Sequence, residues 1–195
     1  MKKATKKQET TKVTKKPKRD IKVVNIVVST SLNHEIPLEK MAATLSNTEY
    51  NPEQFPGLVI RIKEPKTSAL IFSSGKVVCT GARTMENVHL SIKKIIKSLE
   101  KINIKISIEP EVKIQNIVAS GSVGMDLNLN VLAMKLENTE YEPEQFPGLV
   151  YKLEEAKATF LLFSNGKIVC TGTKSEAEVH SALEKLIVNL KKVKA

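Results

Sequence analysis

A thirteen-residue segment that occurs twice constrains the fold of this chain more than any other feature. The copies read NTEYNPEQFPGLV at 47–59 and NTEYEPEQFPGLV at 138–150, and they differ only at Asn51 and Glu142. Two prolines and a glycine within each copy indicate a loop that leads into a strand. Loops tolerate change more readily than cores do, so two near-identical loops in one chain indicate a shared task.

The duplication extends through most of the chain at the same offset of 91 residues. Matched pairs include Asn25 and Asn116, Phe72 and Phe163, Gly75 and Gly166, Cys79 and Cys170, and His89 and His180. A repeat of about 90 residues is too long for a solenoid unit. The offset therefore predicts two similar α/β lobes with a pseudo-twofold relationship, over residues 21–110 and 111–195.

The net charge of +10 belongs mostly to residues 1–20. That segment has nine Lys or Arg against Glu9 and Asp20, whereas the remaining chain has 22 basic and 19 acidic residues. Because it is almost free of apolar side chains, we expect a disordered basic tail. Such a tail either keeps the chain soluble or contacts phosphates without sequence preference, and the sequence leaves both readings open.

Several classes of protein are disfavoured by the composition. No apolar run approaches the ~20 residues of a membrane span, and the lysine-rich start lacks the apolar stretch of a secretory signal. Cys79 and Cys170 each lie in an apolar strand pattern. We expect two buried, reduced thiols and not a disulfide, which is typical of an intracellular protein.

The first repeat has the pattern of four strands and two helices. Strands are predicted at 23–31, 58–64, 67–73 and 76–83, with a two-residue hairpin turn at Ser74–Gly75. Pro37 opens a short helix, and Thr84 caps a long one that runs to about Ile102 with an apolar stripe. The second repeat follows the same order, and Ser175 with Glu178 forms a capping box for its long helix.

Apolar side chains occupy both faces of these strands. Val77 and Cys79, for example, point away from Val78 and Thr80. Two helices per repeat can cover only one face, so the second face is expected to be an exposed interaction surface. The alternative is a sandwich in which the two lobes bury these faces against each other. The pattern alone leaves both open.

The paired motifs NIVVS and NIVAS, EQFPGLV in both copies, and ALIFSSGKVVCTG and LLFSNGKIVCTG resemble the TATA-box-binding protein family over residues 21–193. The resemblance implies an α+β saddle. Its two pseudo-symmetric repeats would share a continuous curved ten-stranded antiparallel sheet on the concave side, with the helices on the convex side. The uncovered face would then bind DNA, which disfavours the sandwich.

The resemblance also implies a function. Family members are general transcription factors that bind the TATA box in the minor groove, bend the DNA, and nucleate a preinitiation complex with transcription factor B and RNA polymerase. Phenylalanine wedges inserted between base steps are a known property of this family, applied here to the matching residues. These residues are Phe55, Phe72, Phe146 and Phe163.

Further contacts carry over at matching positions. Asn25 and Asn116 would donate to adenine N3 and thymine O2, the only acceptors that A·T pairs offer in the minor groove, assisted by Thr80 and Thr171. An apolar floor would comprise Val27, Val78, Val118, Val169, Leu70 and Leu161. Phosphate contacts would come from Arg61, Lys76, Lys152 and Lys167, with Ser74 and Asn165 as uncharged helpers.

The single mismatch between the two copies gains a meaning from the resemblance. Glu142 and Glu144 match acidic positions that contact transcription factor B, whereas the first copy has Asn51 in place of an acid. The compact length and similar repeats indicate an archaeal member, hence a cytoplasmic, DNA-associated protein; a eukaryotic member would be nuclear. Whether two copies form a homodimer without DNA is left open.

No catalytic constellation is visible, and we expect neither an enzyme nor a cofactor. His34, His89 and His180 lack partners at metal-ligand spacing, so no metal site is predicted. One rival interpretation is a sequence-nonspecific architectural DNA-binding protein with the same saddle. Another is the similar fold that occurs as an appended domain in certain glycosylases and ribonucleases.

Overall fold

The computed structural model describes residues 20–107 and 109–194, which form two lobes with one order of elements. The first lobe comprises β1 (Asp20–Ser31), α1 (Leu38–Thr44), β2 (Thr48–Glu49), β3 (Leu58–Ile62), β4 (Thr67–Ile71), β5 (Lys76–Ala82) and α2 (Met85–Glu100). The second comprises β6 (Lys113–Ser122), α3 (Leu129–Lys135), β7 (Thr139–Glu140), β8 (Leu149–Leu153), a 3₁₀ turn η1 (Glu154–Ala156), β9 (Ala158–Leu162), β10 (Lys167–Thr173) and α4 (Glu176–Lys194).

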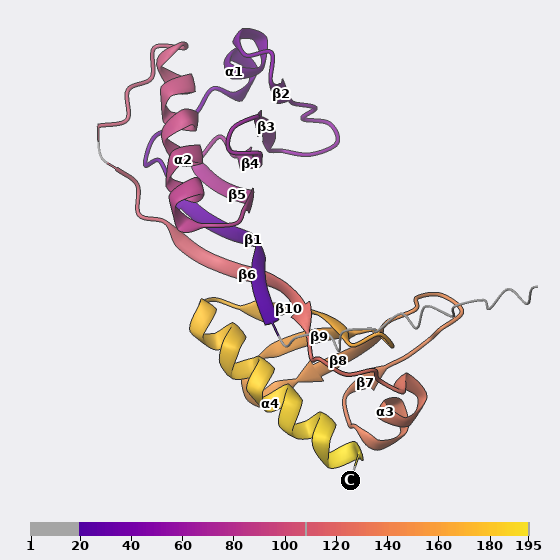
Figure 1. Ribbon diagram of the computed structural model, residues 1–195. Coiled ribbons are helices and arrows are strands. Elements are labelled where there is room, and N and C mark those ends of the chain that lie inside the picture. The colour runs from indigo at the N-terminus through magenta and orange to yellow at the C-terminus, as the bar shows by residue number, and fades with distance from the viewer. Residues whose placement is uncertain (1–19, 108, 195) are drawn as a thin grey trace, which may run out of the picture.

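All ten strands form one antiparallel sheet in the order β2-β3-β4-β5-β1-β6-β10-β9-β8-β7. The lobes meet where β1 pairs with β6, from Asp20 opposite Ser122 to Ser29 opposite Lys113. Figure 1 shows these two strands running between the lobes. The lobes therefore join edge to edge in a continuous sheet, and the alternative of a face-to-face sandwich is wrong.

The core lies between one face of this sheet and the two long helices. Ile26 and Val28 of β1 are buried on that face, where α2 packs on β5 and β1 while α4 packs on β10 and β6. Both helices lie on the same side of the sheet (Figure 1). Each fully buried Ile or Leu side chain contributes about 1.5–3 kcal/mol through the hydrophobic effect. Free thiols at Cys79 and Cys170 are buried here, as predicted.

Local details differ from the sequence prediction at chain reversals. The loop after Phe72 has three residues, because Gly75 donates to the Phe72 carbonyl at 2.9 Å while Phe72 donates to Lys76 at 2.9 Å. Gly75 has φ of +80°, the left-handed conformation that a three-residue hairpin loop requires at this position. The predicted two-residue turn is therefore wrong.

The helix caps agree with prediction in part. Thr84 Oγ1 accepts from the Asn87 amide at 3.2 Å, as expected. In the second lobe, Ser175 Oγ accepts from the Glu178 amide at 3.1 Å, but the Glu178 carboxylate accepts from Lys174 and not from Ser175 itself. The Glu178 side chain thus accepts from the residue before the N-cap, whereas in the usual capping box it accepts from the N-cap residue itself.

The predicted basic tail lies outside the described residues except for Asp20, which already belongs to β1. Within the described part of the chain, no helix combines the length and apolar character needed to cross a membrane.

Candidate nucleic-acid interface

The face of the sheet opposite the helices carries a half-buried apolar surface. The six residues predicted as an apolar floor are all half-buried there, and they alternate along their strands with buried core residues. Val59 and Val150 belong to the same surface, since they lie directly opposite Leu70 and Leu161 across neighbouring strands. The sequence analysis missed these two valines, although the alternation in LVIRI and LVYKL could have identified them.

Four residues related by the pseudo-twofold axis form the centre of this surface. Asn25 lies opposite Val118 and Asn116 lies opposite Val27 in the β1–β6 register. A symmetric arrangement of two amides and two apolar groups therefore occupies the middle of the molecule. It suits a ligand that is itself close to twofold symmetric, as duplex DNA is.

Both asparagine amides are held in one orientation. The Gly81 amide donates to Asn25 Oδ1 at 2.7 Å, and the Gly172 amide donates to Asn116 Oδ1 at 2.8 Å. A backbone N–H can only donate, so each side-chain oxygen must face its glycine and each NH₂ group must face away from it. Asn25 Nδ2 also lies 3.1 Å from Thr80 Oγ1, which leaves its second hydrogen for a ligand acceptor.

The glycines that orient these amides require a special backbone. Gly81 and Gly172 have φ of +98° and +96°, which other residues rarely adopt. A Cβ atom at Gly81 would also lie 3.0 Å from the Lys66 carbonyl oxygen. Irregular register accompanies both sites, in the β1–β5 and β6–β10 pairings. The CTG sequence near the end of β5 and of β10 thus supplies a bulge. In each bulge the glycine N–H is turned toward the asparagine.

Two pairs of phenylalanines lie on the loops that border the surface. Phe55 and Phe72 have ring centroids 5.9 Å apart at 63°, and Phe146 and Phe163 have the same separation at 68°. Phe55 is 43% exposed and Phe146 is 40% exposed, unusual values for such large apolar groups. The fifth phenylalanine, Phe160, is fully buried. The structure therefore brings together the four predicted wedge residues as two pairs, each with one exposed ring and one half-buried ring.

The two pairs occupy opposite ends of the central strands. Phe72 adjoins the hairpin that begins β5, whose first residue Lys76 lies opposite Ser31 at the end of β1. Phe163 adjoins the hairpin that begins β10, whose first residue lies opposite Ser122 at the end of β6. Because β1 and β6 are antiparallel, the pairs are separated by the whole length of the surface.

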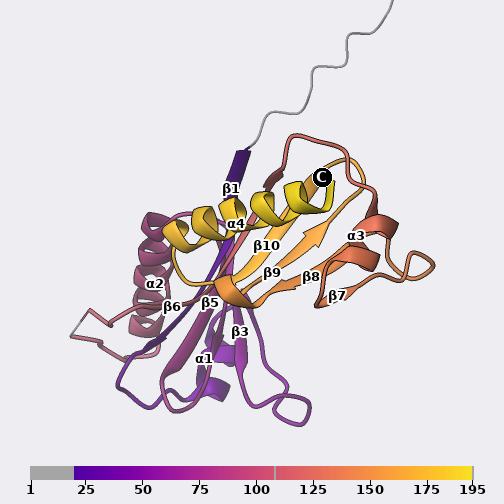
Figure 2. The same cartoon turned by 90° about the horizontal axis from the view of Figure 1, so that it is seen from below.

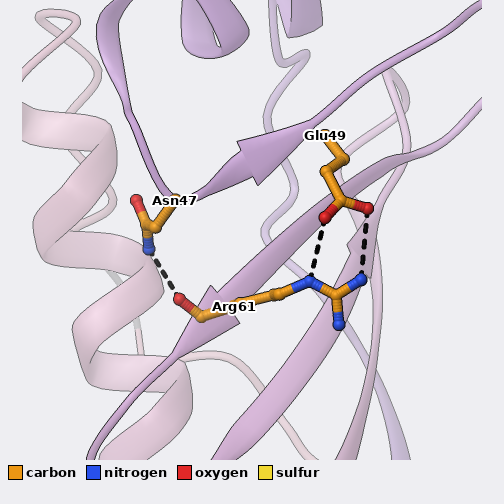
Figure 3. A network of polar contacts seen from close by, with 3 residues as sticks. All are labelled: Asn47, Glu49 and Arg61. Atoms are coloured by element: carbon orange, nitrogen blue, oxygen red, sulfur yellow. Dashed lines mark hydrogen bonds and ion pairs between the residues drawn. The ribbon is translucent and has the colours of Figure 1, made fainter.

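Two of the predicted phosphate contacts are paired with carboxylates. Arg61 Nε and Nη2 each donate to Glu49 at 3.1 Å, and Asn47 Nδ2 donates to the Arg61 carbonyl at 2.7 Å (Figure 3). The hydrogen bonds from Arg61 lower the pKa of Glu49. Lys152 forms the matching pair with Glu140 at 2.7 Å, which raises the pKa of Lys152. Each of these exposed cations would therefore have to exchange its carboxylate partner for the phosphate when DNA binds.

The other candidate phosphate contacts lie on the hairpin loops beside the phenylalanines or on the first residue of the strand that follows each loop. Lys76 and Lys167 are exposed, as are Ser74 and Asn165. Asn165 Oδ1 accepts from the Lys167 amide at 3.1 Å, so its NH₂ group is directed away from that bond.

The duplicated loops share one backbone turn. Phe55 and Phe146 donate through their amides to the carbonyls of Asn51 and Glu142, in both cases at 3.0 Å. Glu142 and Glu144 are exposed, so the loops differ in charge but not in this turn. Elsewhere, residues 20–107 and 109–194 hold no cluster of three or more His, Cys, Asp or Glu side chains that could bind a metal ion.

Comparisons with known proteins agree with this geometry. The family model "Transcription factor TFIID (or TATA-binding protein, TBP)" matches residues 20–102 and 111–193. The TATA-box-binding protein of Methanocaldococcus jannaschii is 52% identical over 174 residues, covering 89% of this chain and 95% of the relative. That of Methanothermobacter thermautotrophicus is 53% identical over 166 residues, covering 85% and 92%.

A solved structure is similar as well. It is that of Methanococcus jannaschii TBP, with a TM-score of 0.83 and 51% identity over 89% of this chain and 99% of that one. Two matched repeats, one ten-stranded sheet and these relatives agree, and the chain belongs to the TATA-box-binding protein family.

Proposed function

We propose that this chain is a general transcription initiation factor that binds an A·T-rich promoter element through the minor groove and bends it. One observation carries the proposal: two oriented amide donors lie at the centre of an apolar surface that ends in two phenylalanine pairs, each with one exposed ring. The archaeal origin of the relatives supports a DNA-associated role in the cytoplasm.

The apolar floor and the central amides would select A·T pairs. A guanine places an N2 amino group in the minor groove, where it would face the Asn25 or Asn116 NH₂ group, donor against donor. The floor offers no acceptor to compensate. Because A·T and T·A present nearly the same acceptors, orientation and finer preference would come from the deformability of base steps and from partner proteins.

Each phenylalanine pair would unstack one base step at an end of the element. Unstacking costs a few kcal/mol per step, and the wider contact with bent DNA offsets that cost, as is known for this family. The edge-to-face packing of each pair presents one rigid wedge. Lys76 and Lys167 lie on the same hairpins and would hold the phosphates beside the kinks.

Measuring how the protein binds and bends two different duplexes tests this function. Wild-type protein should bind a TATA element tightly and bring dyes on its two ends closer, and it should bind a G·C-substituted duplex far more weakly. Phe146→Ala with Phe163→Ala should reduce the bend at one end, and an unchanged energy-transfer efficiency would refute the wedge. Equal affinity for both duplexes would favour the sequence-nonspecific architectural protein instead.

Transcription factor B is the proposed protein partner of the second duplicated loop, and it would connect the complex to RNA polymerase. Glu142 and Glu144 are exposed there and would meet a basic surface. The double variant Glu142→Arg, Glu144→Arg should bind DNA normally and fail to recruit the factor in a gel shift. Normal recruitment would overturn this assignment.

Without DNA, the same apolar surface could be covered by a second copy of the chain. A homodimer formed in this way should dissociate when a TATA duplex is added. Sedimentation equilibrium with and without the duplex distinguishes this arrangement from a monomer.

A further inference from the structure

A groove in the first lobe leads from the centre of the interface toward the edge of the sheet. Asn25 Nδ2 lies 3.1 Å from Thr80 Oγ1. Thr80 lies opposite Ser68 on the next strand, and Ser68 lies opposite Arg61 on the strand after that. These four residues form one row across β1, β5, β4 and β3, and all of them line the groove. Hydrogen-bond donors therefore extend outward from the central amide.

Two lysines complete this groove, and neither is paired with a carboxylate. Lys63 and Lys66 line it from the turn between β3 and β4, and both are exposed. Within the described part of the chain neither lysine forms an ion pair, whereas Arg61 is bound to Glu49. The two lysines can therefore bind an anion without giving up a partner.

The turn that carries these lysines is anchored from the other face of the sheet. Helix α2 lies alongside β5 and β1 (Figure 2), and its Lys94 Nζ donates to the Glu64 carbonyl in the middle of the turn. In the second lobe, the matching Lys185 Nζ donates to the Glu155 carbonyl at 2.8 Å. Each long helix thus holds the turn at the outer end of its own lobe.

Five charged positions surround this turn in each lobe, and they differ in one place. In the first lobe they are Arg61, Lys63, Lys66, Glu49 and Glu64. In the second lobe the equivalent residues are Lys152, Glu154, Lys157, Glu140 and Glu155. Three cations accompany two carboxylates in the first lobe, and two cations accompany three carboxylates in the second. The whole difference is Lys63 in place of Glu154.

We propose that Lys63 and Lys66 form an additional phosphate site for one strand of duplex DNA, and that the first lobe therefore holds the DNA backbone more strongly than the second. The inference rests on the proposed function, because DNA that places its base edges on Asn25 brings its backbone over the outer part of the same row. Lysine binds phosphate as a point charge and reads no sequence. The site adds affinity that depends on salt and makes the two halves of the interface unequal.

The salt dependence of binding tests the phosphate site. Lys63→Gln with Lys66→Gln removes two phosphate contacts, each of which contributes about 0.9 to the slope of log K against log salt concentration. The slope should become shallower by about 1.8, so the advantage of wild type over the variant should shrink about 3.5-fold per doubling of salt.

The matched control removes the same charge from the same lobe on its opposite face. Lys93→Gln with Lys97→Gln changes two exposed lysines of α2 and should leave the salt slope as it is in wild type. An equal change of slope in both double variants would overturn the proposal, because the effect would then reflect net charge alone. An unchanged slope in the variant of Lys63 and Lys66 would overturn it as well.

A half-neutralised duplex tests whether the lobes are unequal. In a self-complementary TATATATA element, methylphosphonates replace the phosphates of one half. An iron chelate on Glu53→Cys, an exposed residue of the first duplicated loop, reports where the first lobe lies. Labelling is selective because Cys79 and Cys170 are both buried. Wild-type protein should cut mainly beside the unmodified half, where the first lobe keeps its phosphates.

Two charge changes of opposite sign should remove that bias. Lys63→Glu and Glu154→Lys each make the charges around the two turns equal, although one lowers the net charge of the chain and the other raises it. Both variants should cut the two sides equally. Equal cutting by wild type, or a bias that persists in both variants, would contradict the unequal grip.

Failure of the proposed function would give a different result. A chain that does not bind the minor groove would not prefer TATATATA over a G·C-substituted duplex. A chain that prefers and bends the element, but shows neither the change in salt slope nor the orientation bias, would retain the function and refute only the additional phosphate site.

Discussion

Asn25 and Asn116 combine a donor with a fixed direction. An asparagine amide on an open surface can rotate and present either its oxygen or its nitrogen, which would give no preference between A·T and G·C pairs. Here a glycine N–H on each side holds the oxygen at 2.7–2.8 Å. Under the proposed function, selectivity at these positions would therefore depend on Gly81 and Gly172 as well as on the asparagines.

Replacement of the amide by a carboxylate tests this reasoning. Asn25→Asp keeps the acceptor for Gly81 but removes the outward donor and adds a negative charge facing the DNA. We expect affinity for a TATA duplex to fall about 10- to 100-fold, the effect of losing a base contact of about 1–3 kcal/mol. Melting temperature should change little. Asn116→Asp is the matched variant, and unchanged binding by either would argue against the donor role.

Replacing either of two buried threonines should change the free energy of unfolding, and the two changes should have opposite signs. Thr173 Oγ1 is buried and has no hydrogen-bond partner within residues 20–107 and 109–194. Thr67 Oγ1 is also buried but lies 2.8 Å from Ser91 Oγ. Thr173→Val removes an unsatisfied hydroxyl, so it should raise the free energy of unfolding by about 1 kcal/mol, whereas Thr67→Val should lower it by about 1–2 kcal/mol. Urea denaturation measures both; the same sign for both would contradict the assignment.

The buried thiols predict a dependence on pH. Burial raises the pKa of both Cys79 and Cys170 from 9.0 to about 11. The unfolded chain ionises first, so their contribution to stability is constant below about pH 9 and declines as the pH rises toward 11. Cys79→Ala with Cys170→Ala should flatten that decline in a urea titration. At pH 8, a thiol reagent should react only after unfolding.

At the scale of elements, the long-range pattern was predictable and the reversals were not. Hydrophobic periodicity identified the longer strands and both long helices, because each buries a continuous stripe. The hairpin after Phe72 was assigned one residue too few, since Ser-Gly is compatible with several turns. β2 and β7 have two residues each, too few to give a pattern.

The same short strands explain what the sequence missed at the interface. Glu49 and Glu140 are brought to Arg61 and Lys152 only by β2 and β7, so neither ion pair was predicted. In contrast, the four phenylalanines and both asparagines stand at matched positions of the repeats, and their roles on DNA, which the family resemblance implies, stay predictions. Duplication marks individual positions, but it carries no information on contacts between short elements.

The glycine beneath each wedge loop allows a test at this scale. A Cβ atom at Gly148 would lie 2.6 Å from the Phe146 ring and 3.0 Å from the Phe163 ring, so Gly148→Ala must displace the wedge. Gly57→Ala is the matched change at the other end. With 2-aminopurine at both end steps of a symmetric element, each variant should lose about half of the unstacking signal, and the double variant nearly all. A full signal in the double variant would show that ring placement is unimportant.

At the scale of the whole molecule, the near-symmetry of the two lobes raises the question of what sets the orientation of the protein on DNA. The open face has the same asparagines, phenylalanine pairs and apolar floor residues at equivalent places in both lobes. A symmetric grip cannot distinguish the two orientations of a symmetric element. Direction must come from features that break the repeat, and the thirteen-residue loops contain one such difference, Asn51 against Glu142.

Removing the difference between Asn51 and Glu142 tests whether it sets the orientation of the protein on DNA. Glu142→Asn makes the two loops identical and leaves the shared turn intact, because only the Glu142 carbonyl accepts from Phe146. We expect unchanged DNA affinity and bend, and a loss of up to about fivefold in transcription factor B recruitment, the effect of one exposed ion pair of up to about 1 kcal/mol.

The control changes the same charge at the opposite lobe. Asn51→Glu should leave recruitment to the second lobe unchanged, since its loop is at the far end of the sheet from Glu142. Recruitment is measured by gel shift with purified factor, and its side by cleavage from a probe on the factor. If Asn51→Glu weakened recruitment as much as Glu142→Asn, the effect would reflect net charge alone. Direction would then have to come from another difference between the two repeats.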